Sequence, residues 1–449
     1  MSQLEANTET DADTPFWEKG NLAPVHEEVT AFDLPVEGAI PPELNGLYAR
    51  NGANPREGHS GHWFLGDGML HGVSLRDGRA EWYRNRWVRT PRFNGAPRKP
   101  GMPDIRSGVA NTNVMAHAGK IMALVESALP VVMSRELDTV GSYDYDGKLD
   151  TPFTAHPKVC PTTGELHFFG YGFVPPFLTY HAVDASGALM HSIPVPVRAP
   201  TMVHDFAMTS GHIVFMDLPV VFDMVAAQRG TMPFAWSETY GARLGILKRG
   251  AGIESLRWVE IDPCYVFHVA NAFEEADGTI VVDVAWYSEL WRGGPSAKTF
   301  DKAAMRRWRV PPGATKAQEQ FLDDRSIEFP RINDDRAGLA HDIVYAVDAG
   351  EGNLATGAYS SIRKYDLKTG KSTEHNFDKG MASEFVHVPG KGGKSEDDGW
   401  LIGFVYDRAR NASDLMILDA QKIESKPVAR IQLPARVPQG FHGNWMPGV

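Results

Sequence analysis

The sequence predicts an all-β fold, and its length favours a β-propeller over a sandwich or a barrel. Short runs rich in Val, Ile, Phe, Tyr and Trp recur along the chain, among them "GKIMALVES", "HIVFMDL", "TIVVDVAWY" and "WLIGFVYD". Asp-Gly pairs such as Asp77-Gly78 and Asp277-Gly278 separate these runs, as expected of tight turns between strands. Seven blades would share the 449 residues at about 64 each, above the usual four-strand repeat, so loops would hold the excess.

Few segments show helical periodicity, and the best helix candidates are 220–228 and 301–308. Residues 1–14 contain four acidic residues and no Lys or Arg, which predicts a disordered acidic tail. No linker interrupts the remainder, so we expect residues 15–449 to form a single β-propeller domain.

The composition excludes several function classes. The net charge is −11, with no clustered basic face of the kind that binds nucleic acid. The chain has two cysteines, Cys160 and Cys264, and no CxxC motif, which favours a reducing compartment. Its first residues lack the features of a signal peptide, and no apolar run approaches a membrane span. We therefore expect a cytoplasmic protein, with at most a weak peripheral contact to membranes, and infer no obligate protein partner.

Four of the sixteen histidines occur in apolar or small-residue stretches, "TAHPK", "MVHDF", "VFHVANAFEE" and "GFHGNW". They are His156, His204, His268 and His442. Their spacings of 48, 64 and 174 residues resemble one, one and three blades. Histidines at equivalent points of inner strands would point at the propeller axis and form a ring of imidazoles. Such a ring is a metal site, and imidazole suits Fe, Zn, Cu or Ni.

Neutral imidazoles leave the charge of a divalent metal uncompensated, so buried carboxylates are expected to accept the other ring N–H. Three glutamates fit, because each lies inside an apolar run: Glu126, Glu328 and Glu384.

With these residues, the chain resembles the carotenoid cleavage oxygenase family, which includes apocarotenoid oxygenases and lignostilbene dioxygenases. Ordered motifs carry the resemblance from about Asn21 to the C-terminus, among them "HWFLGDGMLHGV", "NTNVMAHAGKIMALVE", "EFPRIN", "EDDGWLIGFVYD" and "LPARVPQGFHGNW". It implies a seven-bladed propeller under a dome of loops, with Fe(II) held by the four histidines and the three glutamates behind them. It also implies that Thr112, in "ANTNV", lies near an open iron position. The implied reaction is the addition of O2 across a carbon–carbon double bond, which yields two carbonyl products.

The residues favour an apolar polyene, a carotenoid or an apocarotenoid, as the substrate. Relatives that cleave lignostilbenes grip a phenol with a lysine and a tyrosine, and by motif this chain has Val125 and Trp87 there. Cleavage of a stilbenoid or an isoeugenol-like phenylpropenoid is the alternative, because "FHVANAFEE" also resembles such relatives. The apolar segments 218–234 and 172–178 are candidates for an entrance patch or for ordinary dome packing.

The sequence leaves three other functions as alternatives. A lactonase-type propeller hydrolase would use oxygen ligands for a hard cation, which four histidines do not favour. A scaffold propeller would not need four axial histidines. Isomerisation, known in one branch of the resembled family, would consume no O2.

Overall fold

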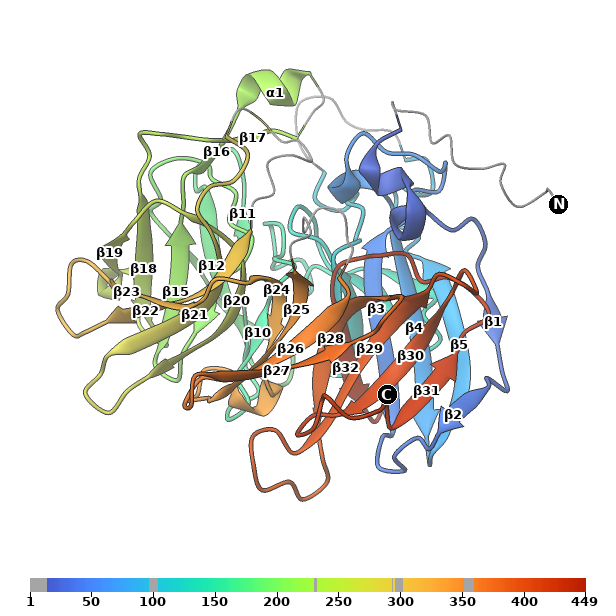
Figure 1. Ribbon diagram of the computed structural model, residues 1–449. Coiled ribbons are helices and arrows are strands. Elements are labelled where there is room, and N and C mark those ends of the chain that lie inside the picture. The colour runs from blue at the N-terminus through green and yellow to red at the C-terminus, as the bar shows by residue number, and fades with distance from the viewer. Residues whose placement is uncertain (1–13, 97–103, 230–231, 293, 295–301, 351–358) are drawn as a thin grey trace.

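The computed structural model describes residues 14–96, 104–229, 232–292, 294, 302–350 and 359–449. Seven antiparallel sheets stand around a common centre, so the predicted seven-bladed β-propeller is confirmed (Figure 1). The predicted disordered tail lies almost wholly outside the described residues.

The blades are numbered in chain order. The strands of blade 1 are given from its outer edge inward, and those of the other blades from the inner strand outward. Blade 1 consists of β1 (Thr30–Ala31), β5 (Arg79–Trp87), β4 (Gly68–Arg76), β3 (Gly46–Ala53) and β32 (Gly443–Pro447). Blade 2 consists of β6 (Asn113–His117), β7 (Lys120–Leu124), β8 (Val131–Met133) and β9 (Thr139–Ser142). Blade 3 consists of β10 (Lys158–Val159), β11 (Leu166–Tyr171), β12 (Leu178–Val183) and β13 (Leu189–Pro194). Blade 4 consists of β14 (Ala207–Met208), β15 (His212–Asp217), β18 (Ala242–Lys248) and β19 (Arg257–Ile261).

The other three blades follow the same order. Blade 5 consists of β20 (Tyr265–Glu274), β21 (Ile280–Tyr287), β22 (Ala303–Val310) and β23 (Gln318–Asp323). Blade 6 consists of β24 (Ser326–Arg331), β25 (Ile343–Gly350), β26 (Ser361–Asp366) and β27 (Lys371–Asn376). Blade 7 consists of β28 (Gly380–Pro389), β29 (Gly399–Asp407), β30 (Ala412–Asp419), β31 (Ala429–Gln432) and β2 (Val36–Gly38).

Both ends of the described chain close the ring. The C-terminal strand β32 pairs with β3, so blade 1 contains the first and the last parts of the propeller. At the other end, β2 pairs with β31 at the outer edge of blade 7. Because backbone hydrogen bonds join the two ends, the ring is closed by main-chain pairing as well as by side-chain packing.

The turn signals in the sequence are local, and the structure bears them out. Asp77 and Gly78 join β4 to β5 with positive φ angles of 47° and 74°, a conformation that suits a two-residue hairpin turn.

Helix prediction was less accurate. Residues 220–222 form β16 (Val220–Phe222), which pairs with β17 (Phe234–Trp236), and only α1 (Met224–Gln228) is helical. The helix predicted at 301–308 is wrong, because residues 303–308 belong to strand β22. Ala and Arg favour a helix locally, but pairing with β21 and β23 overrides that weak preference.

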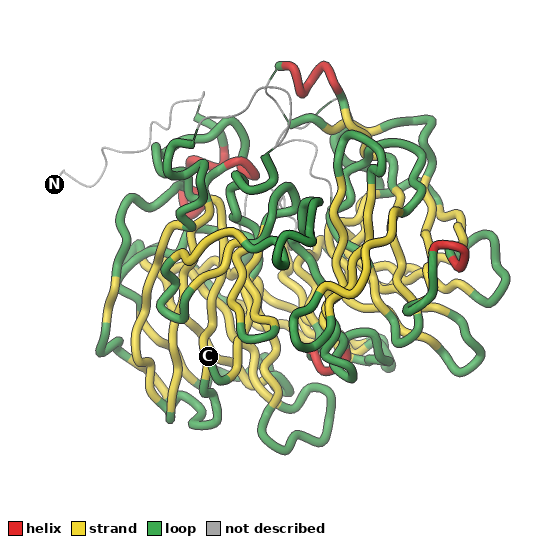
Figure 2. The backbone as a smooth tube through the Cα atoms, turned by 180° about the vertical axis from the view of Figure 1, so that it is seen from behind, coloured by secondary structure: helices red, strands yellow, loops and turns green. Residues whose placement is uncertain are grey.

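Loops and short helices lie over one face of the propeller. In Figures 1 and 2, α1 projects from that face, and the 3₁₀ helices near the N-terminus lie on the same side. These 3₁₀ helices are η1 (Phe16–Glu18), η2 (Gly20–Leu22) and η3 (Trp63–Leu65); two others are η4 (Ile253–Ser255) and η6 (Asp334–Arg336). Among the described residues, the structure contains no helix with the length and apolar character needed to span a bilayer.

Candidate metal centre

The four histidines singled out in the sequence meet at the centre of the ring. His156, His204 and His442 lie just before the inner strands β10, β14 and β32, and His268 lies within β20. They come from blades 3, 4, 1 and 5, which matches spacings of one, one and three blades. One nitrogen from each ring lies within 4.8 Å of the others.

The three glutamates come from the three blades that supply no histidine. Glu126 follows β7, while Glu328 and Glu384 lie in β24 and β28. Each carboxylate accepts a hydrogen bond from the Nδ1 of one histidine. Glu126 bonds to His204 at 2.8 Å, Glu328 to His268 at 2.5 Å, and Glu384 to His442 at 3.1 Å. Among the described residues, no carboxylate bonds to His156.

Each glutamate is itself held in place by a second group. Tyr171 and Tyr287 donate their hydroxyls to Glu126 and Glu328 at 2.9 Å and 2.8 Å. For Glu384 the second donor is the backbone N–H of Gly443, at 2.8 Å.

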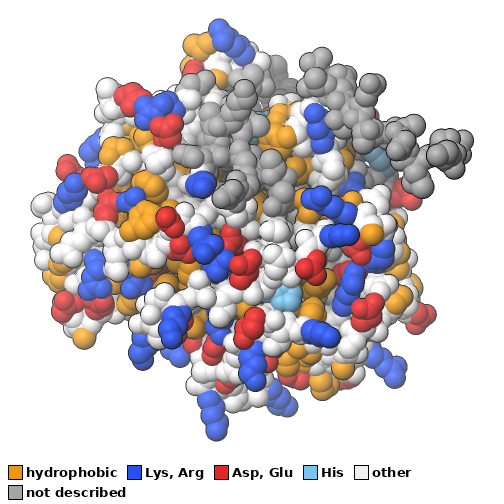
Figure 3. All heavy atoms as spheres, viewed as in Figure 1, with side chains coloured by type: hydrophobic (Ala, Val, Ile, Leu, Met, Phe, Trp, Pro, Cys, Tyr) orange, Lys and Arg blue, Asp and Glu red, His pale blue; other side chains and the backbone are white. Residues whose placement is uncertain are grey.

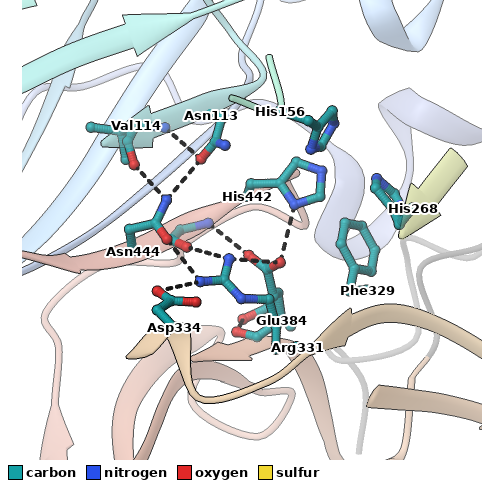
Figure 4. A network of polar contacts seen from close by, with 12 residues as sticks. Asn113, Val114, His156, His268, Phe329, Arg331, Asp334, Glu384, His442 and Asn444 are labelled. Carbon is teal, nitrogen blue, oxygen red and sulfur yellow. Dashed lines mark hydrogen bonds and ion pairs between the residues drawn. The ribbon is translucent and has the colours of Figure 1, made fainter. Parts of the chain in front are cut away.

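Behind Glu384 lies a guanidinium (Figure 4). Arg331 lies 3.5 Å from the carboxylate of Glu384 and donates to the side chain of Asn444 at 2.9 Å. Glu384 thus differs from the other two glutamates, since a positive charge, not a phenol, faces it from behind.

Burial and these partners set the charge states. Burial and the neighbouring imidazoles hold the pKa of His156 well below its usual range. Burial likewise lowers the pKa of His442 to about 4. Although burial opposes it, the adjacent Glu328 raises the pKa of His268. His442 and Arg331 outweigh burial at Glu384 and lower the pKa of its carboxyl to about 2.

These residues fit a divalent metal ion. A bond from Nδ1–H to a glutamate fixes the tautomer that leaves Nε2 as a free electron-pair donor. The buried Nε2 of His268 has no hydrogen-bond partner. The Nε2 atoms of His156 and His204 are 3.0 Å apart. Two imidazole nitrogens at right angles on a metal, each about 2.1 Å from it, would be about 3.0 Å apart.

A large apolar cavity reaches this cluster from the dome side. Its volume is about 880 Å³, and His204, His268 and His442 form its floor. Aromatic and aliphatic side chains make most of the wall, among them Phe64, Val109, Met202, Phe222, Phe234 and Phe267. The volume lies in the range of about 300–1,000 Å³ that is typical of small-molecule sites. We call this space the apolar cavity.

The other predicted site residues differ in position. Thr112 lines the apolar cavity beside the cluster, and its carbonyl accepts the backbone N–H of His442 at 3.0 Å. Val125 also lines the cavity. Trp87, at the end of β5, does not line it, and its indole N–H donates to the backbone carbonyl of Asn54 at 2.9 Å. Its position gives no support to a role in substrate contact.

Sequence reasoning missed several residues of the site. The two tyrosines that hold glutamates lie at strand ends in ordinary apolar runs, and nothing local distinguishes them from core tyrosines. Phe329 has a positive φ of 50° and stacks on the ring of His268 at 5.1 Å. Backbone strain of this kind is common at functional sites. The only sequence feature that indicates a role for Phe329 is its position next to Glu328.

Four imidazoles thus meet at the centre of a seven-bladed propeller, under an apolar cavity, and form a candidate metal centre. The Retinal pigment epithelial membrane protein family model matches residues 22–447. The chain is 39% identical to a carotenoid cleavage oxygenase of Mycobacterium tuberculosis, over 97% of this chain and 98% of that protein. It is 34% identical to carotenoid 9,10(9',10')-cleavage dioxygenase 1 of Arabidopsis thaliana, over 98% and 92%. The chain belongs to the carotenoid cleavage oxygenase family and is an enzyme of that oxygenase type.

Solved structures agree with this assignment. A lignostilbene dioxygenase of Pseudomonas brassicacearum superposes with a TM-score of 0.87 at 29% identity, covering 97% of this chain and 99% of that one. An apocarotenoid oxygenase of Synechocystis gives 0.86 at 27% identity, over 96% and 98%. Isoeugenol monooxygenase of Pseudomonas nitroreducens is 30% identical over 95% of this chain and 97% of that protein.

Proposed function

We propose that this protein is an Fe(II)-dependent dioxygenase that cleaves a carbon–carbon double bond of a carotenoid or an apocarotenoid. The observation that carries the proposal is the apolar cavity, which is floored by the histidine cluster and walled by apolar side chains. The higher sequence identities to carotenoid-cleaving relatives support the same substrate class.

In this proposal His156, His204, His268 and His442 hold the iron, and the three glutamates orient the last three rings. The bound iron would supply the activation of O2, whose two atoms end in the two carbonyl products. Thr112, which lines the apolar cavity beside the cluster, would lie near the bound iron. The cavity wall orients the alkene and excludes water from it.

The residues in the wall of the apolar cavity also indicate the kind of substrate. Among the described residues, Arg92 lines the apolar cavity but no lysine does. Val125 stands where the family resemblance places the phenol-binding lysine of lignostilbene cleavers. The hydroxyls of Tyr171 and Tyr287 are engaged by Glu126 and Glu328. These features favour a hydrocarbon chain over a phenol. Cleavage of a stilbenoid or a phenylpropenoid remains the second candidate, supported by the structural match to the lignostilbene dioxygenase.

An apolar substrate must be collected from a membrane or a droplet, and the cavity leads to an exposed apolar edge. Phe173, Val174 and Met224 line the cavity while 37%, 69% and 59% of their surfaces are exposed. Figure 3 shows apolar side chains at the top of the molecule, where α1 lies in Figure 1. This edge supports a weak peripheral contact with lipid.

The test is a substrate comparison with iron-loaded protein in air. An apocarotenal and a hydroxylated stilbene are supplied in detergent, and products are identified by chromatography and mass spectrometry. Two aldehydes from the apocarotenal, absent without iron and absent in His268→Ala, are expected. Aldehydes from the stilbene alone would replace the substrate assignment with the second candidate. Full activity of His268→Ala or of metal-free protein would contradict the iron centre.

A further inference from the structure

A second cavity reaches the histidine cluster from the side opposite the apolar cavity. Its volume is about 320 Å³, and its wall includes His156, His268 and His442. We call it the axial cavity, because residues of inner strands from several blades line it around the centre of the ring.

The order of residues along the chain shows that the two cavities lie on opposite sides of the cluster. Met202 lines the apolar cavity and Asp205 the axial cavity, with a cluster histidine between them in the chain. In the same way, Phe441 lines the apolar cavity and Asn444 the axial cavity, again across a histidine. Phe329 lines both cavities. The imidazoles and this phenyl ring therefore separate the two spaces.

A larger share of the lining is polar in the axial cavity than in the apolar cavity. Its charged side chains apart from histidine are Lys158, Asp205, Arg331, Asp334, Asp335 and Glu384. Carboxylates outnumber cations among them, and both cations are paired. Lys158 lies 2.7 Å from Asp205, and Arg331 lies 3.4 Å from Asp334. Asp334 and Asp335 are exposed, so the outer end of the wall presents carboxylates to solvent.

A hydrated divalent cation strongly prefers a polar route to an apolar one. Removing an ion from water into an apolar environment is very costly unless fixed ligands replace the lost water. Apart from the exposed Asp104, the carboxylates that line the apolar cavity are Glu126 and Glu328, which are already bonded to histidines and tyrosines. At its outer end the axial cavity presents the exposed carboxylates of Asp334 and Asp335, and hard or borderline cations accept such oxygens.

We propose that the axial cavity is the route by which the divalent metal reaches the four histidines, and that Asp335 steers the ion at its outer end. Substrate and metal then approach the cluster from opposite sides. This inference depends on the proposed function, because it takes the histidines to be a metal site. Carboxylates at the mouth of a cleft raise the local concentration and the association rate of a cation.

The experiment measures the rate of metal uptake, independently of cleavage. Metal-free protein is mixed with Co(II), which a solved apocarotenoid oxygenase of Synechocystis accepts, and binding is followed by absorbance in stopped flow. Asp335→Asn should slow uptake several-fold, on the order of 3–10-fold at low ionic strength, and Asp335→Lys should slow it further. The final cobalt content should stay that of the wild type, because no ligand has changed. Added salt should shrink the difference between variants.

The matched control is Asp104, an exposed carboxylate that lines the apolar cavity. Asp104→Asn and Asp104→Lys should leave the uptake rate unchanged, and so should filling the apolar cavity with a long polyene. The inference is overturned if the Asp335 variants take up cobalt at the wild-type rate, or if the Asp104 variants or the polyene slow it. A wild-type protein that binds no cobalt would instead contradict the proposed metal centre itself.

Discussion

Replacing Glu384 by glutamine tests how the protein holds its candidate metal ligands. Glu384 is 2% exposed, and its two oxygens accept N–H groups from His442 at 3.1 Å and from Gly443 at 2.8 Å. A glutamine has one acceptor oxygen, and its NH2 group must face one of these two donors. One hydrogen bond is therefore lost, either that of Gly443 or that of the His442 ring, and in the second case the ring loses its orientation or its tautomer.

The expected magnitude follows from this geometry. Losing the carboxylate behind a metal-binding histidine typically lowers metal affinity about 10–100-fold. That range corresponds to about 1.4–2.7 kcal/mol of binding free energy. A buried donor left without an acceptor would also lower the free energy of unfolding of the metal-free protein by about 1–3 kcal/mol.

Metal affinity is measured by titrating metal-free Glu384→Gln with Co(II), and stability by denaturant unfolding without metal. The control variant is Glu57→Gln, which makes the same chemical change at an exposed position. Cobalt affinity in Glu384→Gln equal to that of Glu57→Gln and the wild type would refute the reasoning. A loss of stability with unchanged affinity would reduce Glu384 to a purely structural role.

Three further predictions follow from the same site. Val125→Lys should place an ammonium in the apolar cavity, lower turnover of an apocarotenal and favour a phenolic stilbene; an unchanged product ratio in a competition assay would contradict this. Tyr287→Phe removes the donor 2.8 Å from the buried carboxylate of Glu328. It should lower the free energy of unfolding by about 1.5–3 kcal/mol, the usual value for a hydrogen bond to a charged group, as measured in denaturant. Burial lowers the pKa of His442 from 6.5 to about 4, so between these pH values the unfolded chain binds a proton at this residue and the folded chain does not. The free energy of unfolding of the metal-free protein is therefore highest above pH 6.5 and decreases as the pH falls toward 4. The melting temperature should decrease as the pH is lowered across that range. A melting temperature that does not change would be inconsistent with a neutral buried ring.

Much of the fold is encoded locally. The Asp-Gly turn at residues 77–78 requires positive φ angles that these two residue types adopt readily, so a tight turn could be predicted without the rest of the chain. The histidine spacings predicted how many blades separate those residues, because one blade uses a nearly constant length of chain. Where a local preference is weak, the prediction failed. At strand β22 the Ala and Arg residues favour a helix locally, but pairing with β21 and β23 overrides that preference.

The sequence by itself determined the fold class, the family motifs and the set of histidines and glutamates that meet at the centre. Only the tertiary structure decided which glutamate bonds to which histidine, because each pair joins different blades and depends on how the ring closes. Glu126, for example, reaches from blade 2 to His204 in blade 4. The structure alone also placed Trp87 outside the apolar cavity and Arg331 behind Glu384. Such contacts join residues far apart in the chain, so no local pattern of sequence specifies them.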